Sequence, residues 1–333
     1  MSVIRRLLLG GVLAIVASLG FAWWYALVVP GRSHTGALPA ATDDEQAIAR
    51  RLKEHVTAVA SVPHNLKYYA ALENSAQYIE RILEALGYEV TRQVFTVAGR
   101  PVRNIEVERV AQSPEPPSLI IAAHYDSYDN APGANDNGTG VAAVLELARL
   151  LKAWQPQRLR LRLVLFVNEE PPYYRTPDMD SWRYAKLLSE RGEKVHGMIS
   201  LETLGAFSDT SGSQNYPAPF GLLFPSTANF VAFVALTGSR GFLHEVMASF
   251  RRHTGFPSIG GAAPDALVPG VGWTDHWAFG SFGFPAIMIT DTALFRYAHY
   301  HLSSDTPDKI DYDRLARITK GMERVVRDIA SMR

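Results

Sequence analysis

The distribution of short apolar runs constrains the fold of this chain more than any other feature of its sequence. Leu119–Ala123 and Val195–Leu201 are mostly apolar, and Leu159–Val167 alternates arginine with apolar residues before it becomes wholly apolar. Runs of this kind predict strands that are buried on both faces of a parallel sheet. Val141–Leu151 is apolar on most sides and Tyr312–Ile329 is amphipathic, so both predict helices. The alternation predicts an α/β fold: a single domain with a mainly parallel central sheet and helices on both faces.

Polar side chains follow each predicted strand at the point where it ends. His124 and Asp126 follow the first strand, Glu169 and Glu170 the second, and Glu202 the third. In open α/β sheets, functional groups gather just beyond the carboxyl ends of the strands. We therefore expect these five side chains to lie close together at one edge of the sheet.

Two further segments add candidate ligands to the same edge. Asp136 lies in the glycine-rich turn Pro132–Gly140, and Tyr300 and His301 lie near the end of the chain. The chain has no cysteine, so a bound metal must be held by histidine and carboxylate groups, which zinc accepts. Two zinc ions roughly 3.5–4 Å apart need one carboxylate to bridge them. A short acidic residue on a tight turn suits this bridge, and Asp136 has that setting.

The pair Glu169–Glu170 predicts two different roles for adjacent carboxylates. Neighbouring residues on a strand point to opposite faces. Pro171 and Pro172 end the strand at once and hold Glu170 extended. One glutamate can then bind a metal while the other lies over the attacking water.

The first thirty residues predict a membrane anchor in front of the domain. Arg5 and Arg6 precede an uncharged run from Leu7 to Val29, and a helix needs roughly 20 apolar residues to span a bilayer. The run exceeds the about 7–15 apolar residues of a cleaved signal peptide, which favours an uncleaved anchor. The two arginines are expected to stay in the cytoplasm, so the catalytic part is expected outside, in the periplasm or the extracellular space. A reporter fused after Arg333 and found in the cytoplasm would contradict this orientation.

These observations divide the chain into four parts. They are a cytoplasmic stub (1–6), a transmembrane anchor (7–29), a linker (30–42) and a globular domain (43–333). Lysine plus arginine and aspartate plus glutamate are equal at 33 each. Balanced charge gives no electrostatic reason to expect nucleic acid as a partner. Nucleic acid is therefore not expected as a partner, whereas the apolar anchor is expected to lie in a membrane.

Taken together, the motifs resemble those of the di-zinc aminopeptidases of metallopeptidase family twenty-eight, whose relatives include glutamate carboxypeptidases, glutaminyl cyclases and transferrin-receptor ectodomains. The resemblance covers roughly residues 45–330 and keeps the order of the family's motifs. These are His124-x-Asp126, Gly133-Ala134-x-Asp136-x-x-x-Gly140, Glu169-Glu170, Glu202 before Gly205, and Tyr300-His301 with Asp305-Thr306 after it. Any one motif alone is weak, but the ordered series is specific. The resemblance implies a zinc-exopeptidase (phosphorylase/hydrolase-like) fold and a peptide substrate.

The resemblance also implies a role for each site residue. His124 would bind the first of two zinc ions, and Asp136 would bridge both. Glu170 and His301 would bind the second zinc. Glu169 would be the general base.

Three further implications concern the surroundings of the zinc ligands. Asp126 would orient His124, and Tyr300 would hydrogen-bond the tetrahedral intermediate. The peptide bond between Asp136 and Asn137 would be cis, as it is in relatives.

The chain departs from the family at one ligand. The fifth ligand is usually aspartate, and Glu202 stands in its place, so we expect Glu202 to complete the first zinc site through a longer side chain. His299 competes with His301, because residues two apart on a strand face the same way. The family pattern selects His301. Asp275 and His276 are expected to be hydrogen-bonded scaffold.

The expected activity is hydrolysis of the N-terminal peptide bond of peptides, by a metallo-aminopeptidase. Three alternatives stay open at this point. The first is a glutaminyl-cyclase-like acyltransferase with one zinc. The second is an ectodomain without enzymatic activity. The third is a carboxypeptidase or an amidohydrolase on cell-wall or other peptides. Manganese or cobalt could occupy the same ligands, since metal selectivity follows availability as much as affinity.

Overall fold

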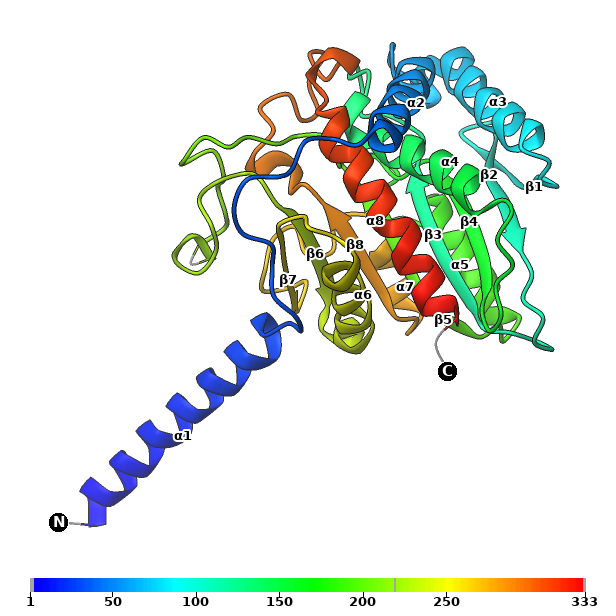
Figure 1. The fold of residues 1–333 in the computed structure, drawn as a ribbon. Coiled ribbons are helices and arrows are strands. Elements are labelled where there is room, and N and C mark those ends of the chain that lie inside the picture. Colours follow the sequence, from blue (N-terminus) through cyan, green and yellow to red (C-terminus); the bar gives the residue numbers. More distant parts are fainter. Residues whose placement is uncertain (1–2, 219, 332–333) are drawn as a thin grey trace.

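The computed structural model describes residues 3–218 and 220–331. In this part of the chain, an eight-stranded sheet has the order β1-β2-β4-β3-β5-β8-β6-β7 (Figure 1). The strands are β1 (Thr91–Val97), β2 (Arg100–Arg109), β3 (Ser118–His124), β4 (Arg160–Phe166), β5 (Val195–Glu202), β6 (Val231–Leu236), β7 (Ser258–Ala263) and β8 (Ala286–Thr290). The α-helices are α1 (Val3–Leu27), α2 (Asp43–Val59), α3 (Tyr69–Ala85), α4 (Thr139–Leu151), α5 (Asp180–Glu190), α6 (Arg240–His253), α7 (His276–Ser281) and α8 (Tyr312–Ser331).

The centre of the sheet is parallel and its two sides are joined to it antiparallel. Strands β4, β3, β5 and β8 are parallel neighbours, whereas β2 pairs antiparallel with β4 and β6 with β8. The prediction of a mainly parallel sheet is right for the centre, but the sheet as a whole is mixed. At the β1–β2 side of the sheet, the antiparallel pairing follows from the turn between these two strands. Ala98 and Gly99, with φ of 48° and 75°, join β1 to β2, and a two-residue turn with both φ positive closes an antiparallel hairpin.

Alternate residues of the central strands face two different layers of helices. Leu119 and Ile121 of β3 belong to the core cluster that includes residues of α2, α4, α6 and α8. Ile120 and Ala122 belong to a second cluster with residues of α5 and α7. Helices therefore cover both faces, and this explains why β3 is apolar from Leu119 to Ala123.

Helix α1 extends away from the domain and meets it at its C-terminal end, beside β7 (Figure 1). Among the helices that the structure describes, none combines the length and the apolar character that are needed to cross a membrane. The transmembrane span predicted over residues 7–29 is therefore not confirmed, and neither is the membrane as a partner of the chain.

Candidate metal centre

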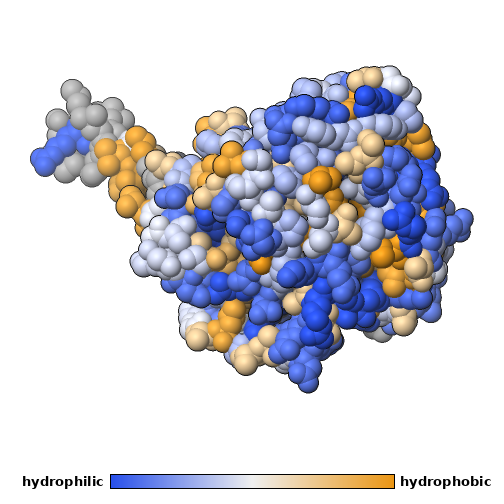
Figure 2. Space-filling view, turned by 90° about the horizontal axis from the view of Figure 1, so that it is seen from above, coloured by the Kyte–Doolittle hydropathy of each residue, from blue (hydrophilic) through white to orange (hydrophobic). Residues whose placement is uncertain are grey.

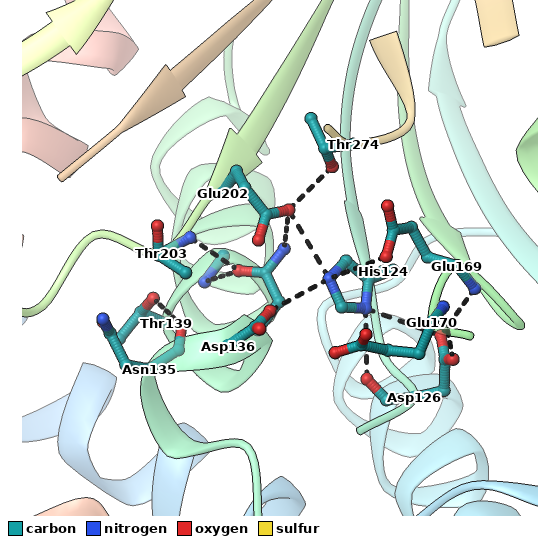
Figure 3. Close-up of polar contacts among 12 residues, drawn as sticks. His124, Asp126, Asn135, Asp136, Thr139, Glu169, Glu170, Glu202, Thr203 and Thr274 are labelled. Carbon is teal, nitrogen blue, oxygen red and sulfur yellow. Dashed lines mark hydrogen bonds and ion pairs between the residues drawn. The ribbon is translucent and has the colours of Figure 1, made fainter. Parts of the chain in front are cut away.

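The predicted site residues converge at the carboxyl edge of the central strands (Figure 3). His124 is the last residue of β3 and Glu202 the last residue of β5. Glu169 and Glu170 follow β4, and Asp136 lies in the turn Ala134–Gly138 that leads into α4. All five side chains are buried. The expected cis peptide bond between Asp136 and the next residue is confirmed.

The carboxylate of Asp136 lies between two imidazole rings. Its Oδ1 is 3.3 Å from Nε2 of His124, and its Oδ2 is 3.0 Å from Nε2 of His301. The two oxygens of one carboxylate thus face the ring nitrogens of two different histidines. This is the arrangement that a carboxylate bridging two cations requires.

The two adjacent glutamates lie against different imidazoles. Glu169 Oε2 is 3.9 Å from Nε2 of His124, and Glu170 Oε2 is 3.4 Å from Nε2 of His301. Glu202 adds a second carboxylate near the first ring, since its Oε2 is 3.5 Å from the same nitrogen of His124. Each imidazole is therefore faced by Asp136 and by at least one glutamate.

The chemistry of this group fits a metal. His124, Asp136 and Glu170 each offer one ligand atom, and these three atoms all lie within 4.8 Å of one another. Glu170 Oε1 is buried and has no hydrogen-bond partner among the residues that the structure describes. A buried carboxylate oxygen without a partner is costly, and a cation would satisfy it.

The concentration of carboxylates changes the protonation of the cluster. Burial alone would lower the pKa of His301, but Asp136 and Glu170 raise it to about 10. Burial raises the pKa of Glu170 to about 7 and that of Glu202 to about 8. Burial also raises the pKa of Glu169 well above its usual range. At neutral pH the cluster therefore binds protons, and these offset the negative charge of its buried carboxylates.

Neighbouring polar groups fix the orientation of the cluster. Asp126 accepts hydrogen bonds from the backbone N–H groups of Glu169 (3.1 Å) and Glu170 (3.2 Å), and its Oδ1 is 3.5 Å from Nδ1 of His124. Its carboxylate therefore links the ends of β3 and β4. The backbone carbonyl oxygen of Asp126 lies nearer, 3.1 Å from the same Nδ1, so the orienting role expected of the Asp126 carboxylate stays a prediction.

Two residues that the motifs did not single out hold Glu202. Its Oε2 accepts hydrogen bonds from Thr274 Oγ1 (2.7 Å) and Asn137 Nδ2 (3.0 Å). Asp305 has a similar role for the turn, because it accepts hydrogen bonds from the backbone N–H of Asn135 (2.8 Å) and of Asp136 (3.2 Å). Thr274 precedes Asp275 in the sequence, and Asp305 lies in the last family motif. Both segments therefore contribute residues that hold Glu202 and the Asp136 turn in place.

His301 is held between two tyrosine rings. Tyr300 stacks on it with a centroid distance of 3.9 Å, and Tyr128 stacks on it at 4.0 Å and an interplanar angle of 7°. His301 itself has a φ of 59°, a strained value for a residue with a side chain, of the kind that collects at functional sites. The sequence analysis did not identify Tyr128 as a site residue. Its position two residues after Asp126 is the one feature of the sequence that could have indicated it.

His299 and His276 lie outside the cluster. His299 Nδ1 is 2.9 Å from Ser304 Oγ, and His276 Nε2 is 2.7 Å from the carbonyl oxygen of Val271. These contacts agree with the choice of His301 over His299 and with a scaffold role for His276.

The sequence is similar to known peptidases over most of its length. A model of Peptidase family M28 matches residues 104–326. Uncharacterized protein YfbL from Escherichia coli (strain K12) is 37% identical over 260 residues, which are 75% of this chain and 78% of YfbL. A probable zinc metalloprotease from Pyrenophora tritici-repentis is 26% identical over 294 residues, which are 78% of this chain and 57% of that protein.

Solved structures show the same fold. BSAP, a zinc aminopeptidase from Bacillus subtilis, superposes with a TM-score of 0.67 at 16% identity, covering 86% of this chain and 95% of that one. A glutaminyl cyclase from Bacteroides thetaiotaomicron bound to N-acetylhistamine superposes with a TM-score of 0.62 at 18% identity, covering 88% and 99%. Because aminopeptidases and cyclases share the fold, the overall architecture does not separate the two activities.

Proposed function

The chain belongs to peptidase family M28, and from this membership we propose that it is a zinc-dependent aminopeptidase that uses two zinc ions and a glutamate base. The observation that carries the proposal is the Asp136 carboxylate, whose two oxygens face His124 and His301 at 3.3 and 3.0 Å. A bridging carboxylate with one imidazole on each side suits two cations rather than one. This favours a hydrolase over a one-zinc cyclase.

We assign the ligands by their neighbours in the cluster. His124 and Glu202 would hold the first zinc, His301 and Glu170 the second, and Asp136 both. Bound zinc would polarise the scissile carbonyl and lower the pKa of the attacking water.

Glu169 would take the proton from that water and return it to the leaving amine. Its carboxylate lies beside His124 but is not needed to complete either ligand set. Burial raises its pKa, and cations bound beside it would lower that pKa, so the loaded centre would favour the ionised base. Tyr300, stacked on His301, would donate a hydrogen bond to the oxyanion of the tetrahedral intermediate.

The proposed activity is tested with matched dipeptides that are free or acetylated at the N-terminus. We expect the full-length protein to cleave only the free dipeptides and to lose this activity on chelation. Cleavage of acetylated peptides would move the substrate class to that of a carboxypeptidase or an amidohydrolase. Conversion of N-terminal glutamine to a ring, with one zinc per chain, would identify a cyclase instead.

Zinc binding is expected to release protons and to strengthen as the pH rises. In the metal-free centre, Asp136 and Glu170 raise the pKa of His301 to about 10, so this ring is protonated at pH 7. Zinc takes the neutral imidazole and the ionised carboxylate, so zinc that binds at His301 must displace the proton of this ring. Calorimetry in buffers of different ionisation enthalpy measures the number released at pH 7, which should decrease towards pH 10. A heat of binding that is the same in every buffer would contradict this.

Loss of the ring of Tyr128 is expected to weaken metal binding. Stacked aromatic rings contribute about 0.5–1.5 kcal/mol, so Tyr128→Ala should lower zinc affinity roughly 2- to 12-fold, at about 1.4 kcal/mol per factor of ten. Tyr128→Phe keeps the ring and should bind zinc like the wild type. Competition with a chromophoric chelator measures both affinities. Equal weakening in the two variants would show that the hydroxyl, not the stacking, matters.

Glu202→Ala is expected to reduce the bound zinc from two ions per chain to one. The variant removes the carboxylate that lies 3.5 Å from Nε2 of His124 and leaves the His301 side of the cluster unchanged. Glu202→Asp keeps a carboxylate of the type that the family uses, so it should retain both ions. Elemental analysis after dialysis gives the stoichiometry. Two ions per chain in Glu202→Ala would exclude this residue as a ligand.

A further inference from the structure

A cavity lies beside the metal centre. Its volume is about 170 Å³, which is room for on the order of ten water molecules. Glu202 and Tyr300 belong to its lining, together with residues of β6, β7 and β8. Among the described lining residues, Glu202 is the one that carries an ionisable carboxyl or amino group, and most of the others are aliphatic or aromatic. The cavity therefore favours apolar groups over unpaired charges, which are costly in such surroundings.

The end of helix α1 forms part of the wall of this cavity. Ala26 and Leu27, the last two residues of α1, line it. They reach it across the edge strand β7 at Gly261. A Cβ atom at this glycine would lie 3.0 Å from the carbonyl oxygen of Ala26 and 3.3 Å from Cδ2 of Leu27. The missing side chain thus permits the close approach of α1 to the sheet. Figure 2 shows apolar residues gathered where α1 meets the domain.

The segment Trp24–Ser33, which we call the strap, is fastened to the domain at both of its ends. At the α1 end, Arg240 Nε donates a hydrogen bond to the carbonyl oxygen of Tyr25 at 2.6 Å. The same guanidinium lies 4.8 Å from the centre of the Tyr25 ring and 4.9 Å from that of Trp24.

At the other end of the strap, α6 and β7 supply the partners. Arg251 Nη1 donates hydrogen bonds to the carbonyl oxygens of Pro30 (2.8 Å) and Gly31 (3.1 Å). The backbone N–H of Ser258 donates to Ser33 Oγ at 2.8 Å. Hydrogen bonds from charged donors are about twice as strong as neutral ones, so the strap is a fixed part of the domain surface.

We propose that the strap is a wall of the substrate pocket and that Leu27 limits the length of the apolar N-terminal side chain that the enzyme accepts. The inference rests on the proposed aminopeptidase function. Glu202 and Tyr300 connect the metal centre to the cavity, so a peptide whose first bond lies at the centre extends its first side chain into the cavity. The preferred substrates are therefore peptides that begin with a large apolar residue.

The test compares alanyl-, leucyl- and phenylalanyl-4-nitroanilide as substrates of the full-length protein. We expect the wild type to prefer the leucyl and phenylalanyl substrates. Small changes in an apolar pocket alter selectivity about 10- to 200-fold. Leu27→Trp should therefore lower kcat/KM for the phenylalanyl substrate at least ten-fold relative to the alanyl one. Leu27→Ala should shift this ratio the other way. The alanyl side chain is the shortest of the three and is expected to end before Leu27, so this substrate reports whether the catalytic centre is intact.

The matched control is Leu13→Ala, the same substitution at a position of α1 that is 61% exposed. It should leave all three ratios as in the wild type. If Leu27→Trp also loses the alanyl activity, Leu27→Ala decides. An unchanged phenylalanyl-to-alanyl ratio in a Leu27 variant that cleaves the alanyl substrate would overturn the inference alone. A wild type that cleaves none of the three substrates would overturn the proposed function and the inference with it.

Discussion

Glu169→Gln is expected to lower kcat about 100- to 10,000-fold, the usual contribution of a positioned general base, while two zinc ions stay bound. Glutamine has nearly the same shape as glutamate but cannot accept the proton of the attacking water. The proposed ligands are His124, Asp136, Glu170, Glu202 and His301. Glu169 is not among them, so metal content should not change. Steady-state kinetics and elemental analysis of the same preparation measure both quantities.

Glu89→Gln is a suitable control for this variant, because Glu89 is exposed and lies outside the site. It should keep the wild-type kcat. If Glu169→Gln kept activity within ten-fold of the wild type, the proton would have to pass through another group. If it lost zinc, Glu169 would be a ligand rather than a base.

Asp136→Asn is expected to abolish tight binding of both zinc ions and to reduce activity to that of the chelated wild type. The two oxygens of Asp136 face two histidines, and these rings hold the pKa of its carboxyl well below the usual range. Asparagine keeps one oxygen and replaces the other by an NH₂ group, which is not a zinc ligand. One substitution therefore affects both sites at once.

The control for this variant is Asp209→Asn, whose side chain is 69% exposed and pairs with Arg314 on the surface. It should bind two zinc ions per chain. Excess zinc should not restore activity to Asp136→Asn, whereas it should restore activity to the chelated wild type. An Asp136→Asn protein that retains two ions after dialysis would contradict the bridging role.

Much of the central sheet could be predicted because burial on two faces leaves a simple signal. β3 is apolar from Leu119 to Ala123, and polar residues stand at or just after the ends of β3, β4 and β5. The strand β7, with the sequence Ser-Ile-Gly-Gly-Ala-Ala, left no such signal, since glycine and alanine are poor strand formers. Strand β6 was not predicted, although Val231–Leu236 is apolar. Its antiparallel attachment could not be predicted either, because strand direction depends on how the chain crosses the sheet and not on local composition.

Site residues could be predicted where they belong to a sequence motif. They could not be predicted where their position depends on packing between distant segments. His124 and Asp136 stand in motifs that can be read from their neighbours. The stacking of Tyr128 on His301 joins residues far apart in the chain, and the same is true of the contact of Leu27 with the cavity. Such contacts follow from the fold and leave no local pattern. The linker predicted over residues 30–42 likewise gave no indication that Ser33 is bonded to β7.

The hydrogen bonds from Asn135 and Asp136 to Asp305 have a consequence for the biosynthesis of the protein. The turn that carries Asp136 is held by a residue translated long after it, and α8, which packs against α2 and α4, is translated later still. A nascent chain that has emerged only as far as β8 lacks His301 and this support. The complete arrangement of the candidate site can therefore form only after translation has passed Asp305.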